Sequence, residues 1–174
     1  PQDRYRSRIR FRFGGSYAFN ETVKIGTRMV TGSSGNPNST HQDVGGDDDD
    51  LGSFDVSLDR LYMSYNPEWA QGTWFIFGKF GNPFAKNPVW SGLAWDDDVQ
   101  PEGMAFGRDE GAFSWTAGEY VLDESSSGTE TLMAVAEVRM APVQGFGLSA
   151  ALYDYDNNVD SILDRRDGDD KKSY

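Results

Sequence analysis

Residues 4–13 read Arg4-Tyr5-Arg6-Ser7-Arg8-Ile9-Arg10-Phe11-Arg12-Phe13, with an arginine at every second position as far as Arg12. Successive side chains of a β-strand point to opposite faces, so this stretch predicts a strand that is cationic on one side and mostly apolar on the other. Neighbouring arginines on one sheet face repel each other unless water or anions screen them. The stretch therefore indicates a sheet with water against one face and an apolar phase against the other.

Alternation of this kind recurs along the chain, with turn signals between the segments. It predicts strands over residues 4–19, 22–31, 54–65, 73–80, 103–108, 112–122, 131–140 and 145–155. In the third segment the phase slips between Leu58 and Leu61, which indicates a bulge or a later strand start. Segments 73–80 and 112–122 are apolar on both sides in places, so alternation alone does not determine their facing.

Charge is distributed unevenly between the predicted strands and their connections. The chain has 16 basic and 28 acidic residues and a net charge of -12. Most of the basic residues fall in predicted strands, whereas most of the acidic ones fall in loops, turns and ends. The acidic total argues against nucleic-acid binding through a basic surface. The strands themselves carry mainly positive charge.

Connection lengths alternate between short and long. The connections 20–21, 66–72, 109–111 and 141–144 are short, whereas 32–53, 81–102, 123–130 and the residues after 155 are longer and more polar. Short turns on one rim and long loops on the other are typical of outer-membrane barrels, in which the short turns face the periplasm. A short first connection implies that the first segment runs towards the periplasm, so we expect at least one strand before Pro1.

These patterns together predict an all-β fold: an antiparallel, up-and-down transmembrane β-barrel. We expect residues 1–174 to form an interior portion of a single barrel domain of about 16 or more strands, because an 8-strand barrel is filled by its own side chains. The residues expected to line the lumen are Arg4, Arg6, Arg8, Arg10, Arg12, Lys24, Arg28, Arg60, Lys79, Glu137 and Arg139. The alternative is a soluble sheet whose exposed arginines pair with acids on a neighbouring strand.

Two acidic clusters lie in long connections. The connection 81–102 combines aromatic and acidic residues, and a loop this aromatic is not expected to extend freely into water. We interpret it as folding into the lumen opposite the arginines and narrowing the path; the residues concerned are Trp90, Trp95, Asp96, Asp97 and Asp98. The other cluster is a solvated loop or, alternatively, a site for a divalent cation, which prefers oxygen ligands; it comprises Asp47, Asp48, Asp49 and Asp50.

Residues for catalysis are scarce. The chain has no cysteine and a single histidine, His41, which leaves almost no material for a zinc site or a histidine-based triad. The acids cluster in loops without the isolated carboxylate pair that glycoside hydrolysis needs. We therefore expect no enzymatic activity and no cofactor.

Several short motifs, taken in order, resemble a known family. They are Arg4-Tyr5-Arg6-Ser7-Arg8-Ile9-Arg10, Gly26-Thr27-Arg28 with Thr31-Gly32-Ser33, Leu58-Asp59-Arg60-Leu61-Tyr62, Gly78-Lys79-Phe80-Gly81-Asn82-Pro83-Phe84, Trp95-Asp96 with Pro101-Glu102-Gly103, and Val121-Leu122-Asp123-Glu124. Over residues 4–155 the chain resembles the putative porins of Gram-negative outer membranes, which are similar in style to general and phosphate-selective porins. The aspartates at 47–50 are not part of the family pattern.

The resemblance implies passive diffusion of small hydrophilic solutes, contact with outer-membrane lipid, and the trimeric assembly common among porins. The basic strands add the expectation that the solutes are anionic. Two alternatives stay open. One is a structural or surface-binding outer-membrane barrel whose lumen is plugged by its loops, and the other is a soluble β-domain that binds an acidic ligand.

Overall fold

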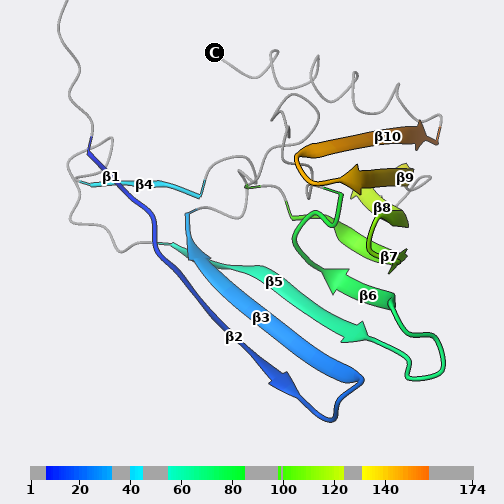
Figure 1. Ribbon diagram of the computed structural model, residues 1–174. Helices are drawn as coiled ribbons and strands as arrows, with labels where there is room; N and C mark the ends of the chain where they lie inside the picture. Colours follow the sequence, from blue (N-terminus) through cyan, green and yellow to red (C-terminus); the bar gives the residue numbers. More distant parts are fainter. Residues whose placement is uncertain are drawn as a thin grey trace, which may run out of the picture.

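The computed structural model describes residues 7–32, 40–44, 55–84, 98, 100–123 and 131–156. One 8-stranded antiparallel sheet has the spatial order β10-β9-β8-β7-β6-β5-β3-β2 (Figure 1). Its strands are β2 (Arg12–Ala18), β3 (Val23–Thr31), β5 (Val56–Tyr65), β6 (Thr73–Lys79), β7 (Glu102–Asp109), β8 (Phe113–Asp123), β9 (Thr131–Val143) and β10 (Phe146–Tyr155). Each strand overlaps one of the predicted segments, and each pairs with its neighbours in chain order. The all-β antiparallel meander is confirmed.

The first predicted strand is interrupted at Arg10 and Phe11, so the prediction of one continuous strand was wrong there; residues 4–6 lie outside the described residues. A separate two-stranded sheet pairs β1 (Arg8–Ile9) with β4 (Gln42–Asp43), beyond one end of β2 and β3 (Figure 1). Just before β2, Phe11 is still bonded to β3. Its backbone N–H donates to Thr31 Oγ1, and its carbonyl oxygen accepts from the backbone N–H of Thr31. Alternation could not reveal this break, because the partner of β1 lies in the distant connection between β3 and β5.

Among the described residues the sheet is open, since its edge strands β2 and β10 do not pair with each other. A closed barrel therefore remains a prediction. None of the described residues lies in a helix. Accordingly, the described part of the chain has no helix of the length and apolarity that membrane crossing requires.

The phase slip in the third predicted strand is confirmed as a bulge. The register between β3 and β5 shifts between Arg28, which lies opposite Arg60, and Met29, which lies opposite Leu58. Asp59 is thus the extra residue on the bulged strand. Because of the bulge, Arg60 lies on the same face of the sheet as Arg28. The apolar residues on either side of it, Leu58 and Leu61, both lie on the opposite face.

The two faces of the sheet follow from the register, because residues directly opposite each other on paired strands share a face. One face, here called the apolar face, carries exposed hydrophobic side chains on all eight strands, among them Phe13, Met29, Leu61, Phe77, Met104, Val121, Val138 and Leu148. The other, here called the arginine face, carries Arg12, Arg28, Arg60, Trp74, Tyr120 and Met133.

The buried hydrophobic cluster lies on the arginine face, over β6 to β9. Its members are Phe80, Phe84, Ala105, Tyr120, Met133 and Val135, with Tyr62, Trp74 and Ile76 packed against them. Phe80 and Phe84 belong to the connection that follows β6, so that connection turns back over the sheet instead of continuing away from it. Burial therefore covers part of the arginine face, while the apolar face stays bare.

Candidate functional site

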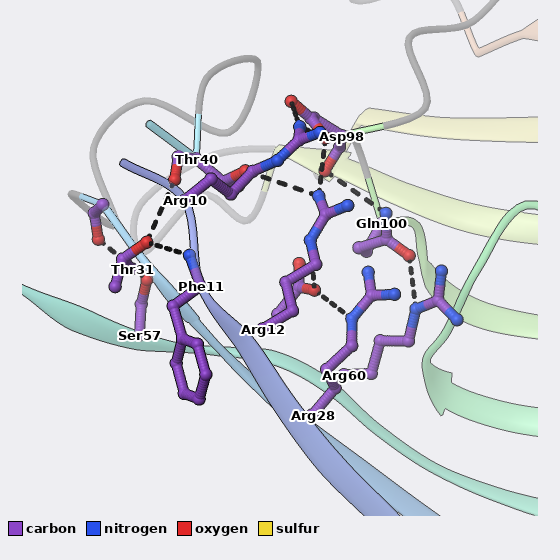
Figure 2. A network of polar contacts seen from close by, with 12 residues as sticks. Arg10, Phe11, Arg12, Arg28, Thr31, Thr40, Ser57, Arg60, Asp98 and Gln100 are labelled. Atoms are coloured by element: carbon purple, nitrogen blue, oxygen red, sulfur yellow. Dashed lines mark hydrogen bonds and ion pairs between the residues drawn. The ribbon is translucent and has the colours of Figure 1, made fainter. Parts of the chain in front are cut away.

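Four arginines gather where β2, β3 and β5 lie side by side (Figure 2). Arg12, Arg28 and Arg60 lie on these three strands at neighbouring register positions, and Arg10 lies two positions before the start of β2. Two carboxylates and one amide hold them: Asp59, Asp98 and Gln100. We call these seven residues the arginine cluster.

Asp59 is the buried centre of this cluster, with an exposed fraction of 5%. Its Oδ2 accepts a hydrogen bond from Arg28 Nε and lies 3.8 Å from Arg12 Nε. The bulge in β5 places this carboxylate between the two arginines. Because a buried carboxylate needs a charged or hydrogen-bonding partner, the position of Asp59 depends on the arginines as much as theirs depends on it.

Asp98 and Gln100 enter the cluster from the far end of the connection between β6 and β7. Arg10 Nη1 donates to both carboxylate oxygens of Asp98, at 3.0 and 3.1 Å, and Arg12 Nη2 donates to Oδ1 at 2.5 Å. Gln100 Oε1 accepts from Arg60 Nε at 2.7 Å, and Gln100 Nε2 donates to the backbone oxygen of Asp98 at 3.3 Å. These bonds join β2, β5 and the connection in one network (Figure 2).

Positive charge exceeds negative charge in the cluster. It contains four guanidinium groups and two carboxylates, which leaves a formal surplus of two positive charges among its members. Arg12 Nε and Arg28 Nη2 are buried and have no hydrogen-bond acceptor among the residues that the structure describes. Such a cluster attracts anions and repels cations, and guanidinium groups keep their charge at any working pH.

The near end of the same connection is held by apolar contacts. The Phe80 ring centroid lies 5.9 Å from that of Tyr120, and Phe84 meets the same tyrosine edge to face at 6.0 Å. Phe80 is fully buried, and Phe84 and Tyr120 are nearly so. Phe80 also donates its backbone N–H to Pro101 at the other end of the connection. The described ends of this connection therefore both lie against the arginine face.

Large side chains on this face lie over glycines of the neighbouring backbone. A Cβ at Gly81 would stand 2.6 Å from Arg60 Nη2, and a Cβ at Gly107 would stand 2.7 Å from the Trp74 ring. The Tyr62 ring covers Gly26 in the same way. Glycine at these positions leaves the space in which the guanidinium and the rings lie flat against the sheet.

The other described residues that were expected to line the lumen lie outside the arginine cluster. Arg8 lies in β1 and pairs with Asp43 at 2.9 Å, so it is separated from Arg12 by the break in the strand. Lys24 is exposed on the arginine face at the opposite end of β3. Glu137 and Arg139 share the arginine face of β9 and line a small pocket of about 40 Å³ beside Trp74.

The facing predicted for Lys79 differs from the observed one. The register puts it opposite Leu61 and Glu102, and hence on the apolar face, where it forms an ion pair with Glu102. Its predicted place on the cationic side was wrong because the residues before it are apolar on both faces, so their alternation did not reveal the facing.

Several expected residues lie outside the described residues: Arg4, Arg6, Asp47, Asp48, Asp49, Asp50, Trp90, Trp95, Asp96 and Asp97. Asp98, the last of the expected narrowing residues, is described and contacts the arginines as given above. Its role in a constriction stays a prediction.

Sequence reasoning missed four residues that organise the site: Asp59, Phe80, Gln100 and Tyr120. A signal existed for Asp59, because it is an acid inside the phase slip and directly precedes Arg60. Phe80 and Tyr120 gave no such signal, since both lie in segments that are apolar on two sides.

Comparison with known families gives one finding. A family model described as "Putative porin" matches residues 1–167. The comparison with curated proteins gives no match, and the comparison with solved structures gives none either.

Proposed function

Because the chain belongs to the putative porin family, a membership that supports a porin-like role, we propose that it forms part of a transmembrane β-barrel in the outer membrane of a Gram-negative bacterium. We propose that this barrel is a passive diffusion channel for small hydrophilic solutes and that its lumen wall favours anions. Trimeric assembly, which is common among porins, belongs to the same proposal.

The observation that carries the proposal is the contrast between the two faces of one sheet. The apolar face exposes large hydrophobic side chains across all its strands, with Phe13 69% and Leu152 78% exposed. Soluble proteins rarely leave a continuous apolar surface of this kind uncovered. In an outer-membrane barrel such a face meets lipid, and the alternate residues of each strand meet the aqueous lumen.

The arginine cluster supports the preference for anions. Its surplus of positive charge lies on the face that would line the lumen, beside a wall of low dielectric constant. The electric field of charges beside a wall of low dielectric constant is screened less than the field of charges at an open surface. Rings or columns of charged side chains set charge selectivity in pores, so the cluster would raise the local concentration of anions and lower that of cations.

A loop-plugged structural barrel is the second candidate, and a specific observation favours it. Phe80, Phe84 and Pro101 cover part of the arginine face, so the connection occupies space that an open channel would leave to water. In our proposal this connection narrows the path without closing it. Open-channel conductance separates the two candidates, because a plugged barrel would show none.

The test is electrical. The purified protein is reconstituted into a planar bilayer, and the reversal potential is measured under a salt gradient. We expect stepwise conductance and a reversal potential of the sign given by anion preference. Absence of conductance would favour the plugged barrel, and cation preference would contradict the role given to the arginines.

Substitutions refine this test. A unit charge about 8 Å from the ion path is worth about 0.5 kcal/mol in water, roughly twofold in permeability. We expect Arg12→Gln and Arg28→Gln each to reduce anion preference by about this factor. Lys79→Gln is the matched control, since it removes the same charge from the apolar face and should leave the reversal potential unchanged.

A further inference from the structure

Asp98 lies between two arginines that stand two positions apart. Arg10 Nη1 reaches both of its oxygens and Arg12 Nη2 reaches Oδ1, so two guanidinium groups share one carboxylate. The Asp98 side chain is 12% exposed, whereas those of Arg10 and Arg12 are 39% and 26% exposed. Charged donors around a planar, two-oxygen anion make strong and directional contacts. The geometry is that of a carboxylate-binding site with a carboxylate in it.

The site and its occupant come from different parts of the chain. The two arginines belong to the segment that starts the sheet, and Asp98 lies 86 positions beyond Arg12, at the end of the connection between β6 and β7. Arg12 is also held from the other side, because Asp59 lies between it and Arg28. At least one of the two guanidinium groups would therefore stay in place if Asp98 were replaced.

The charge of the cluster favours a replacement anion. With Asp98 neutralised, the four guanidinium groups would face one carboxylate among the described residues, that of Asp59, and the formal surplus within the cluster would rise from two positive charges to three. Arg10 and Arg12 would then repel each other without the anion that now separates them. A free carboxylate of the right size would relieve this repulsion.

We propose that Arg10 and Arg12 form a binding site for the carboxylate group of a small solute, and that Asp98 occupies this site as an internal competitor. The inference rests on the proposed channel function for the route by which a solute reaches the site, and it names the solute class: small carboxylates. A tethered group competes at a high effective concentration, so the native protein binds free carboxylates weakly and releases them readily. Weak binding of this kind suits a diffusion channel.

The experiment removes the occupant and supplies a substitute. Asp98→Ala deletes the carboxylate, and formate is the probe because it is about the size of the deleted group. Binding of carbon-13-labelled formate is followed by NMR on the detergent-solubilised protein. We expect Asp98→Ala to bind formate at least roughly tenfold more tightly than the unsubstituted protein. Adding Arg12→Gln to that variant should abolish the gain.

The comparison variant is Asp43→Ala, which removes a carboxylate that pairs with Arg8 and lies outside the arginine cluster. It should bind formate no more tightly than the unsubstituted protein. If Asp98→Ala behaves like this control, Asp98 is only an anchor for its connection and the proposal fails. Inorganic phosphate is run in parallel, and tighter binding of phosphate than of formate would overturn the assignment to carboxylates.

Two features keep the test decisive. If Asp98→Ala does not fold, Asp98→Asn replaces it, since the amide keeps the shape and removes the charge; a gain in formate affinity is again required. The binding readout needs no open channel. If the variant gains formate binding but the protein conducts no current, this inference stands and the channel proposal fails. If the protein conducts current but the variant gains no formate binding, the channel proposal stands and this inference fails.

Discussion

The arginine face contains two regions that hold the same connection by different means. In the arginine region, over β2, β3 and β5, the connection ends in Asp98 and Gln100, which are held by charge and hydrogen bonds. In the aromatic region, over β6 to β9, it begins with Phe80 and Phe84, which are held by burial. Ion pairs near water weaken with salt, whereas apolar burial does not. The aromatic region therefore holds the connection independently of salt, and in our proposal the arginine region leaves the charged end of the connection exchangeable.

The largest effect should come from breaking the aromatic region. Phe80→Ala removes a fully buried ring that packs against Tyr120, which should lower the free energy of unfolding by about 3 to 5 kcal/mol. Thermal unfolding in detergent, followed by circular dichroism, measures this loss. Phe77→Ala is the control on the apolar face, where the ring is partly exposed and the cost should be clearly smaller. Equal losses would show that Phe80 is not an anchor.

A smaller effect should come from the arginine region. Asp59→Asn leaves Arg28 and Arg12 without their buried counter-charge and should destabilise the protein by about 2 kcal/mol, since both arginines retain some access to water. Asp43→Asn breaks the more exposed pair with Arg8 and should cost about 0.5 kcal/mol. Chemical denaturation of both variants gives the comparison. A cost for Asp59→Asn as small as that for Asp43→Asn would mean that the cluster contributes charge but little stability.

The smallest effect concerns Gly81, which lies between the two regions. A Cβ there meets the flexible end of Arg60, so Gly81→Ala should move the guanidinium while leaving the free energy of unfolding within about 0.5 kcal/mol. The displaced guanidinium should loosen its bond to Gln100 and alter anion preference by less than the loss of a whole charge. Bilayer reversal potentials detect this change. If Gly81→Ala lowers the free energy of unfolding but leaves the reversal potential unchanged, the added methyl group strains the backbone and does not displace the guanidinium.

The strands and the bulge could be predicted from the sequence, whereas the facing of some residues and the anchoring of the connection could not. Alternation and turn signals together located all eight strands of the large sheet, and the phase slip marked the position of the bulge at Asp59, because these features depend on local pattern. The facing of Lys79 and the anchoring by Phe80 were not predictable, since β6 is apolar on both faces and its facing is decided by what packs on it. The split between Arg8 and Arg12 depends on pairing with β4, which no local pattern encodes.

The central claim is that one face of this sheet meets lipid and the other meets water. The chain has no cysteine, so single cysteines can be introduced along β3 without background labelling. In liposomes, Lys24→Cys and Arg28→Cys should react with a membrane-impermeant thiol reagent, whereas Ile25→Cys and Met29→Cys should resist it and be quenched by lipid-borne probes once labelled. Accessibility should thus alternate with a period of two residues. Equal reactivity on both faces would contradict the account.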